Sequence, residues 1–394
     1  MRVTAGEGSS AQVAPGDGTV MYAQIVGWGY AVPSRIMTNL DIEKMVDTSD
    51  EWIRTRTGIS ERRIAGPKES TSTLATRAAL NALQAADLSP SKLDLVIVAT
   101  STPDFLLASV ASIVQDNIGA SKAGAFDLNA ACSGFIYALS VANGMIASGL
   151  HETILVIGAD TLSRLVDWTD RSTCVLFGDG AGALVLRRSD FPTGLRSCIL
   201  GSDGSGVGSL YVPAGGSRTP ISPEHIQSRQ HFIKMKGSEV FRFAVNAMTQ
   251  ATQQAVQAAG MTMDDIDLFI PHQANIRIIT AAAKALKIPT EKVFSNVDRY
   301  GNTSTASIPI ALCEAIEMGK VTVGANLAMV GFGAGLSWGA AVVQWGVDAT
   351  PVPIAWWKSM LRNIQSREAV VRSFALRTQR RLDAIRRLNG VNGV

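Results

Sequence analysis

The sequence NALQAADLSPSKLDLVI (residues 81–97) returns later in the chain as QAVQAAGMTMDDIDLFI (254–270). The two segments align without gaps, and seven of the 17 positions are identical, including Asp94 with Asp267. Each copy predicts a helix, a short loop and a buried strand. Chance similarity between two alanine-rich helices does not explain the match, because the shared strand lies outside the alanine run. The repeat therefore predicts an α/β protein with duplicated halves.

Two further segments mark where the halves end. GAGALVLRR (180–188) and SWGAAVVQW (337–345) are predicted to form matched apolar strands, one closing each half. We therefore expect a first half at residues 21–195 and a second half at residues 196–346. An N-terminal extension at residues 1–20 precedes them, and a C-terminal extension at residues 347–394 follows them.

The segment DLNAACSGF (127–135) predicts a strand, a turn of small residues and a helix that begins at Cys132. Free N–H groups and a partial positive charge at a helix start lower the pKa of a thiol and favour a nucleophilic thiolate. The small neighbours leave room for a substrate carbonyl to reach the sulfur. Taken alone, a cysteine at such a position is more often an inert buried thiol.

Two segments of the second half have the same design. IDLFIPHQANIRIITAAAKAL (266–286) places His272 between a strand and a helix, and RYGNTSTASIPIAL (299–312) places Asn302 in a turn before a helix. Turns of this kind carry the chemistry of many α/β folds. A thiol, an imidazole and an amide can serve as nucleophile, base and carbonyl polariser. Singly, the histidine could be a core residue and the asparagine a turn residue, but together the three residues favour a catalytic site.

These segments, with GFGAGLSWG (331–339), resemble the signature motifs of β-ketoacyl-acyl carrier protein synthase III, the condensing enzyme that starts type II fatty-acid synthesis. The resemblance runs from about residue 21 to residue 346. Elongating synthases have a second histidine at the third catalytic position and thiolases a second cysteine, whereas Asn302 follows the initiating enzyme. The resemblance implies the thiolase fold, with duplicated halves in five α-β-α-β-α layers.

The resemblance also implies a reaction. Cys132 would take an acyl group from an acyl-CoA primer, and malonyl-acyl carrier protein would then lose carbon dioxide and attack the acyl-enzyme. His272 and Asn302 would donate hydrogen bonds to the malonyl thioester. The oxyanion would be held by the backbone N–H of Cys132 and one near Gly333 and Ala334. No metal or cofactor is expected, since coenzyme A enters as part of the substrate.

Coenzyme A binding is implied for other segments. DTSDEWIRTRTGI (47–59) resembles the family's coenzyme segment, which assigns adenine stacking to Trp52 and phosphate binding to Arg56. Arg171 matches the arginine that covers the other face of adenine. The remaining substrate-binding positions implied by the resemblance are Gly237, Phe241, Asn275 and Phe332.

Partners are implied in the same way. Arg242, Arg277 and Lys284 form a predicted basic rim for the acidic acyl carrier protein. Leu107 falls where a bulky phenylalanine restricts some family members to acetyl primers, so a leucine favours short or branched primers as well. The loop around Leu107 reaches the partner subunit in the family, which implies a homodimer.

Composition agrees with an enzyme of this size. The chain has 394 residues, 46% of them hydrophobic, enough for one large core or two fused ones. Its four cysteines show no paired spacing, so neither a disulfide framework nor a zinc site is predicted. No apolar run reaches the ~18 residues of a membrane span. Residues 1–19 lack the apolar core of a secretory signal, so we expect a cytoplasmic enzyme.

The C-terminal extension departs from the family. Residues 347–394 carry nine Lys or Arg against three acidic residues, and their apolar residues recur at helical spacing. A basic amphipathic helix of this kind fits packing on its own dimer, contact with a membrane surface or docking of an acidic partner. A poorly ordered tail is a further alternative. Nucleic-acid binding is not expected, because no base-stacking pattern accompanies the charge.

Three other functions remain open at this stage. A related acyltransferase could use the same fold without decarboxylation, but such enzymes tend to lose the asparagine found here as Asn302. A starter condensing enzyme of specialised (polyketide) metabolism is a second alternative. A non-catalytic binding protein is disfavoured by the intact trio of Cys132, His272 and Asn302.

Overall fold

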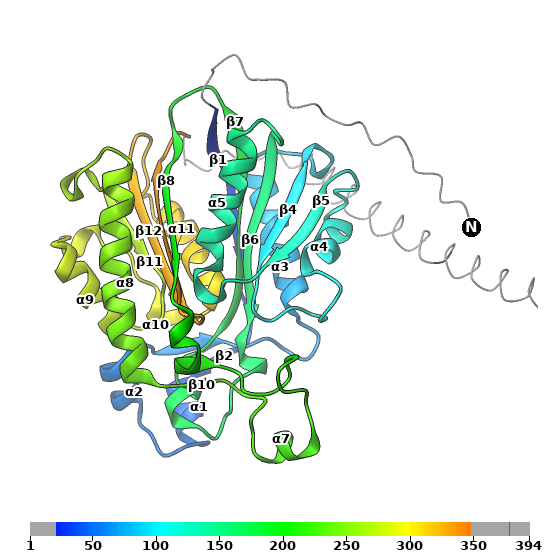
Figure 1. Ribbon diagram of the computed structural model, residues 1–394, viewed down its shortest axis with the longest axis vertical. Coiled ribbons are helices and arrows are strands. Elements are labelled where there is room, and N and C mark those ends of the chain that lie inside the picture. Colours follow the sequence, from blue (N-terminus) through cyan, green and yellow to red (C-terminus); the bar gives the residue numbers. More distant parts are fainter. Residues whose placement is uncertain (1–20, 348–377, 379–394) are drawn as a thin grey trace, which may run out of the picture.

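The computed structural model describes residues 21–347 and residue 378 (Figure 1). The predicted extension 1–20 and nearly all of the predicted basic extension 347–394, with its amphipathic helix, lie outside the described residues.

The first sheet has five strands in the order β1-β7-β6-β4-β5. β4 pairs in parallel with both of its neighbours, while β7 runs antiparallel to β1 and β6. The strands are β1 (Tyr22–Ala31), β4 (Leu95–Ala99), β5 (Gly124–Leu128), β6 (Thr153–Thr161) and β7 (Asp179–Ser189).

The second sheet repeats this pattern. Its order is β11-β12-β13-β8, with β11 and β12 parallel and the other pairs antiparallel. An isolated parallel bridge between Phe269 and Val293 takes the place that β5 has in the first sheet. The strands are β8 (Gly194–Ser202), β11 (Leu268–Pro271), β12 (Asn326–Gly333) and β13 (Ser337–Gln344).

Six longer helices complete five layers (Figure 1). α5 (Gly134–Ala147) and α11 (Ser307–Glu317) lie between the sheets and contact both. α3 (Thr71–Ala85) and α4 (Val110–Ile118) cover the outer face of the first sheet. α8 (Gly237–Ala258) and α9 (Ile276–Leu286) cover the outer side of the second. The predicted thiolase fold in five α-β-α-β-α layers is confirmed.

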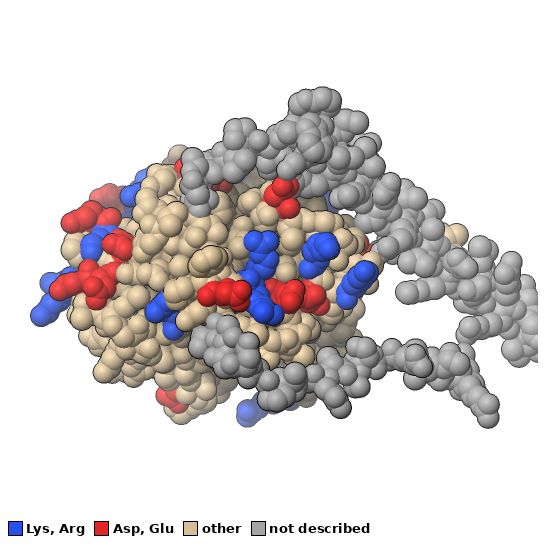
Figure 2. Space-filling view, turned by 90° about the horizontal axis from the view of Figure 1, so that it is seen from above, with Lys and Arg blue, Asp and Glu red and all other residues tan. Residues whose placement is uncertain are grey.

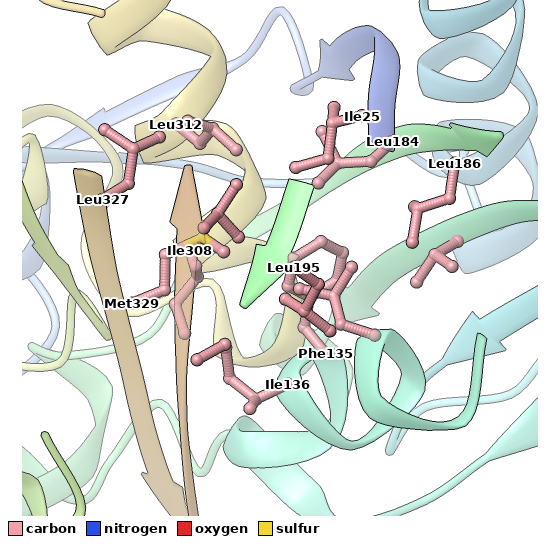
Figure 3. Close-up of a cluster of buried hydrophobic side chains, with 14 of the residues drawn as sticks. Ile25, Phe135, Ile136, Leu184, Leu186, Leu195, Ile308, Leu312, Leu327 and Met329 are labelled. Carbon is pink, nitrogen blue, oxygen red and sulfur yellow. The ribbon is translucent and has the colours of Figure 1, made fainter. Parts of the chain in front are cut away.

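The core follows these layers. The central cluster joins the buried helices to both sheets, as Phe135 and Ile308 do with Leu184 and Met329 in Figure 3. Separate clusters lie under the outer helices of each half. α5 and α11 are apolar around much of their circumference because both of their faces are covered.

The sequence repeat forms equivalent structure in both halves. Each copy ends a helix, α3 or α8, passes through a 3-10 turn and enters a strand, β4 or β11. The carboxylate of Asp94 accepts the N–H of Thr153, and that of Asp267 accepts the N–H of Asn326, each at 2.8 Å. Thr153 and Asn326 are the first residues of β6 and β12. The aspartate shared by the two copies of the repeat therefore anchors the start of the neighbouring strand in both halves. Equivalent residues are 173 positions apart, as residues 81 and 254 are.

Short elements cover one end of the two sheets (Figure 1). They are β2 (Ile36–Thr38), α1 (Asn39–Glu43), α2 (Asp50–Thr57), β3 (Glu61–Arg63), α6 (Arg171–Cys174), β9 (Leu210–Tyr211), α7 (Pro223–Gln227), β10 (Lys234–Met235) and α10 (Val297–Tyr300). At the opposite end, acidic and basic side chains alternate over the visible surface, without a large patch of one sign (Figure 2). In the described part of the chain, no helix has the length and apolar character needed to span a membrane.

Candidate active site

Cys132 lies in a sharp turn between β5 and α5. The turn is a single 3-10 turn over Ala131–Ser133, and Ala131 has a φ of 47°, a left-handed conformation that disfavours residues other than glycine. We call residues 129–134 the first elbow. Strain at such a turn is typical of functional sites, where the surrounding packing holds it in place. The sequence prediction of Cys132 at the start of a helix is refined to the turn directly before it.

The first elbow opens into a cavity of about 670 Å³. Cys132 lines it together with Ser304 and Asn129, and its thiol is almost fully buried. The apolar part of the wall is formed by Leu162, Leu165, Phe177, Leu210, Val212 and Ile233. A cavity of this size, with a largely apolar wall and the sulfur in its lining, suits an acyl chain.

Burial raises the pKa of the Cys132 thiol to about 12, although the Ser304 hydroxyl, which donates to Sγ at 3.3 Å, acts in the opposite direction. The sequence-based expectation that the start of a helix lowers the pKa of Cys132 is therefore wrong, because this pKa is raised. Desolvation of the charged sulfur outweighs the hydrogen bonds from the Ser304 hydroxyl and the Cys132 backbone, which lower the pKa.

His272 directly follows β11 and is buried. Burial lowers the pKa of its imidazole to about 3, so the ring is neutral near pH 7. The neutral state of the imidazole thus follows from its burial. Nδ1 lies 2.5 Å from the Ser307 hydroxyl, while Nε2 is buried without a partner among the described residues. The Phe332 ring packs edge-on against the imidazole, with 5.2 Å between the two ring centroids.

Asn302 begins a turn of the same kind before α11. Its side-chain oxygen accepts the Ser304 N–H at 2.8 Å, and Ser304 has a φ of 54°. Because an N–H can only donate, this bond fixes the orientation of the amide and leaves its NH₂ group as the free donor. No partner for that NH₂ group occurs within residues 21–347. The backbone of Asn302 bonds to Leu176 and Gly178, which ties the turn to the first half.

The two turns are structural copies. We call residues 302–307 the second elbow; each of its residues lies 173 positions after its counterpart in the first. The side chain of Asn129 accepts the N–H of Ala131 at 3.0 Å, just as Asn302 accepts that of Ser304. The bond between Ser304 and Cys132 joins the elbows directly.

The second elbow also links the three predicted catalytic residues. It contains Asn302, and its hydroxyls contact Cys132 through Ser304 and His272 through Ser307. Of the three, Cys132 lines the cavity, whereas His272 and Asn302 are not among its lining residues.

Gly333 lies against the first elbow. A Cβ on this glycine would come within 2.6 Å of the Cys132 nitrogen, so only a glycine fits beside that N–H. Ala334 lines the cavity, and its carbonyl accepts the Ser337 hydroxyl at 2.9 Å. The predicted oxyanion residues are thus next to Cys132.

Trp52 of α2 and Arg171 of α6 are also brought together. The Arg171 guanidinium lies over the Trp52 ring, 5.0 Å from its centroid, and donates to the carbonyl of Asp47. The two side chains predicted to cover the faces of adenine are therefore stacked directly on each other. An adenine ring could bind between them only if they moved apart.

The other predicted coenzyme residues lie nearby. The Asn275 amide donates to the carbonyl of Arg56 at 3.0 Å, and its oxygen caps α9 through the N–H of Arg277. Phe241 of α8 lies under the Arg277 guanidinium, and Gly237 is the exposed first residue of α8. None of these residues lines the Cys132 cavity.

The predicted docking residues Arg242, Arg277 and Lys284 are exposed on the adjacent helices α8 and α9. Leu107 is fully exposed, with its neighbours Phe105 and Leu106 at 62% and 91% exposure. Within a single chain, Leu107 therefore does not reach the cavity.

Sequence reasoning missed three residues at this site. Ser304 contacts Cys132 and Ser307 contacts His272, and buried Asp160 accepts the N–H and hydroxyl of Thr305 in the second elbow. The run of hydroxyls in NTSTAS (302–307) was the available signal for the first two. Within residues 21–347, no group of three His, Cys, Asp or Glu side chains could hold a metal ion.

The fold, with a cysteine elbow at the centre of duplicated halves, defines a thiolase-fold condensing enzyme. Two family models match the chain: 3-oxoacyl-[acyl-carrier-protein] synthase III over residues 126–204, and the C-terminal region of that enzyme over residues 256–345. The chain belongs to the β-ketoacyl-[acyl-carrier-protein] synthase III family.

Individual relatives support this assignment. The chain is 54% identical to the β-ketoacyl-[acyl-carrier-protein] synthase III of Symbiobacterium thermophilum, over 82% of this chain and 98% of the relative. The crystal structure of 3-oxoacyl-[acyl-carrier-protein] synthase III from Aquifex aeolicus is 48% identical, with a TM-score of 0.77, covering 82% of this chain and all of that one. The priming β-ketosynthase of the R1128 polyketide pathway is 36% identical, with a TM-score of 0.78, over 84% and 98% of the two chains.

Proposed function

We propose that this enzyme joins an acyl-CoA primer to malonyl-acyl carrier protein, with loss of carbon dioxide, and so begins fatty-acid synthesis. The observation that carries the proposal is the meeting of the two elbows, which brings the Cys132 thiol to the segment that begins with Asn302. Family membership supports the same activity.

In the first step, the Cys132 sulfur attacks the primer thioester. A bond forms between this sulfur and the acyl carbon, the bond to the coenzyme sulfur breaks, and the thiol proton ends on coenzyme A. The N–H of Cys132, beside Gly333, is suited to hold the oxyanion, and Ala334 is the adjacent cavity residue. Because burial disfavours the free thiolate, we expect attack and proton loss to occur together once the thioester is bound.

In the second step, malonyl-acyl carrier protein loses carbon dioxide. The free Nε2 of His272 and the free NH₂ group of Asn302 are the donors available for the enolate oxygen. Oriented donors of this kind in a dry site are typically worth about 3 kcal/mol each. The enolate carbon then attacks the acyl-Cys132 carbonyl, the sulfur leaves and takes up a proton from solvent to restore the thiol, and 3-ketoacyl-carrier protein is released. No step requires a cofactor.

We further propose that the enzyme is a homodimer whose subunits complete each other's acyl pocket. The exposed apolar tip at Phe105, Leu106 and Leu107 supports this proposal, because three adjacent bulky side chains are seldom left in water. A leucine at the end of the pocket favours acetyl, propionyl or branched primers. We place the enzyme in the cytoplasm, where coenzyme A thioesters and acyl carrier protein are available.

Coenzyme A would enter between Trp52 and Arg171, which would separate to admit adenine, with Arg56 near the phosphates. The carrier protein would dock on Arg242, Arg277 and Lys284, the exposed basic residues of α8 and α9. Contacts of this type weaken as salt is added, so the KM for malonyl-carrier protein should rise with ionic strength.

The proposal is tested by supplying acetyl-, propionyl- or isobutyryl-CoA together with malonyl-acyl carrier protein and identifying the product by mass. We expect 3-ketoacyl-carrier protein from at least one primer, and none from Cys132→Ala or from a reaction without malonyl-carrier protein. Transfer of the acyl group to an alcohol or amine, with no loss of carbon dioxide, would instead identify a non-decarboxylating acyltransferase.

A polyketide starter synthase is the second candidate, supported by the 36% identical priming β-ketosynthase. The chemistry is the same, so the carrier protein distinguishes the two functions. A higher kcat/KM with a fatty-acid carrier protein than with a polyketide carrier protein is the result expected here, and the reverse order would favour the polyketide function.

A further inference from the structure

The second elbow carries two hydroxyls that meet catalytic atoms. Ser304 donates to Sγ of Cys132 at 3.3 Å, and the Ser307 oxygen lies 2.5 Å from Nδ1 of His272. At the equivalent positions the first elbow has Ala131 and Gly134. A turn of this shape therefore forms without either hydroxyl, so the turn itself does not account for them.

Ser304 has an unfavourable backbone conformation, and its hydroxyl contacts the sulfur of Cys132. Its φ of 54° is one that glycine adopts more easily, yet the residue is a buried serine with its hydroxyl on the sulfur. Sulfur carries most negative charge when it attacks the primer and when it is later expelled. Hydrogen bonds to charged acceptors are stronger than those to neutral ones, so this donor favours the charged sulfur most.

Ser307 determines which nitrogen of His272 holds the proton. The N–H of Gln273 points to the Ser307 oxygen at 3.4 Å, so this oxygen accepts there and its own hydrogen is available for Nδ1. A neutral imidazole has a single N–H, and if Nδ1 accepts, the hydrogen is on Nε2. Nε2 is the buried atom without a partner among the described residues, as a donor reserved for substrate would be.

We propose that Ser304 is a further catalytic residue for acyl transfer to Cys132, and that Ser307 is a positioning residue that makes His272 a hydrogen-bond donor for decarboxylation. The inference rests on the proposed function, whose two steps it assigns to different hydroxyls. Acyl transfer forms the bond from Sγ to the acyl carbon, breaks the bond to the coenzyme sulfur and leaves the proton on coenzyme A. Decarboxylation leaves the electron pair on the malonyl thioester, where charge collects on oxygen and not on Sγ.

Acyl transfer and decarboxylation can be measured separately. Each serine can therefore be tested against both steps in the full chain. Rapid-quench mass spectrometry measures the rate at which Cys132 is acylated by the primer that the wild type uses, and release of carbon dioxide from malonyl-carrier protein by the acyl-enzyme measures the second step. The variants are Ser304→Ala, Ser304→Gly, Ser307→Ala and Ser307→Thr. Ser197→Ala is the control, since it removes a hydroxyl that donates to the backbone carbonyl of Ala255 in the second half.

Both Ser304 variants should acylate about 10- to 100-fold more slowly, as expected for loss of a bond to a charged group, with decarboxylation near the wild-type rate. Ser307→Ala should show the opposite pattern by a similar factor, and Ser307→Thr, which keeps the hydroxyl, should restore most of the rate. Nitrogen NMR of His272 should report a hydrogen on Nε2 in the wild type and a mixture of tautomers in Ser307→Ala.

Specific results would overturn the assignment. A wild-type rate in Ser304→Gly would mean that backbone strain, not the missing hydroxyl, slows the alanine variant. Equal slowing of both steps in each variant, beyond that of Ser197→Ala, would point to general damage, and an unchanged tautomer in Ser307→Ala would remove the role of Ser307. If the wild type itself forms no acyl-enzyme with any primer, the proposed function fails, a result distinct from all of these.

Discussion

The two elbows share a backbone but differ in what surrounds them. Both begin with an asparagine that caps the turn, contain one residue with a left-handed φ and lead into a central helix. Cys132 of the first elbow corresponds to Thr305 of the second. Gly158 of β6 packs on the second elbow, and its counterpart Gly331 of β12 packs on the first.

The decisive difference lies two residues after these glycines. In β6 the position is Asp160, whose carboxylate accepts the Thr305 N–H at 3.1 Å. In β12 it is Gly333, which leaves the corresponding N–H of Cys132 without a carboxylate. The second elbow thus holds a carboxyl oxygen of the protein at the position equivalent to the one where the proposed reaction would place its oxyanion. In one copy of the turn a carboxyl group occupies this position, and in the other the position is left open for the proposed reaction.

The largest effect is expected from Asp160→Ala. The buried carboxylate accepts from Thr100, Ser101, Thr102 and twice from Thr305, at 2.8 to 3.1 Å. Removing it takes the acceptor away from five donors, most of them buried, which should lower the free energy of unfolding by about 3–5 kcal/mol. Denaturant titration measures this, with exposed Asp190→Ala as the control. A loss below about 1 kcal/mol would mean that the second elbow is not held by this carboxylate.

Gly333→Ala tests the open elbow. Its methyl group would lie 2.6 Å from the Cys132 nitrogen, so the elbow must shift, and kcat/KM should fall by about 100-fold, as for other small displacements of reacting groups. The matched control is Gly144→Ala within α5, where a Cβ meets nothing within 4 Å and activity should be retained. Equal activity of the two variants would remove Gly333 from the site.

The pH dependence of alkylation tests whether burial controls the thiol. With the pKa of Cys132 raised to about 12, the thiolate fraction rises with pH until that value is reached. The rate of reaction with iodoacetamide should therefore increase about tenfold per pH unit from pH 7 to 9, without a plateau. Mass spectrometry of the labelled peptide, with Cys132→Ser for background, follows the rate. A plateau near pH 8 would show that the helix start outweighs burial after all.

The smallest effect concerns the fourth position of each elbow, Cys132 in the first and Thr305 in the second. Thr305→Val removes one hydroxyl bond to Asp160 and should cost about 1 kcal/mol of stability. Cys132→Ser keeps the size of the side chain and should change stability less, yet abolish condensation. Thermal unfolding and product formation measure the two quantities in parallel. If Cys132→Ser proved the more destabilising variant, the division between a structural and a catalytic elbow would be wrong.

The sequence predicted the fold because the repeat and the strand-to-helix turns are local patterns. It predicted Cys132, His272 and Asn302 as site residues for the same reason, since Cys132 and His272 each follow a recognisable strand and Asn302 precedes a recognisable helix. The pKa of Cys132 could not be predicted in the same way, because the burying walls come from distant residues such as Phe177 and Ile233. The contact between Ser304 and Cys132 spans 172 positions, and only the packing of the two elbows creates it.

The central claim is tested most directly by the intact mass of the enzyme after mixing with an acyl-CoA primer, followed by malonyl-acyl carrier protein. We predict a gain of one acyl group, located on Cys132 and absent from Cys132→Ala, which disappears on addition of malonyl-carrier protein as 3-ketoacyl-carrier protein forms. An enzyme that gains no mass from acetyl, short-chain or branched primers, or one whose acyl group remains in place with malonyl-carrier protein, would contradict the account.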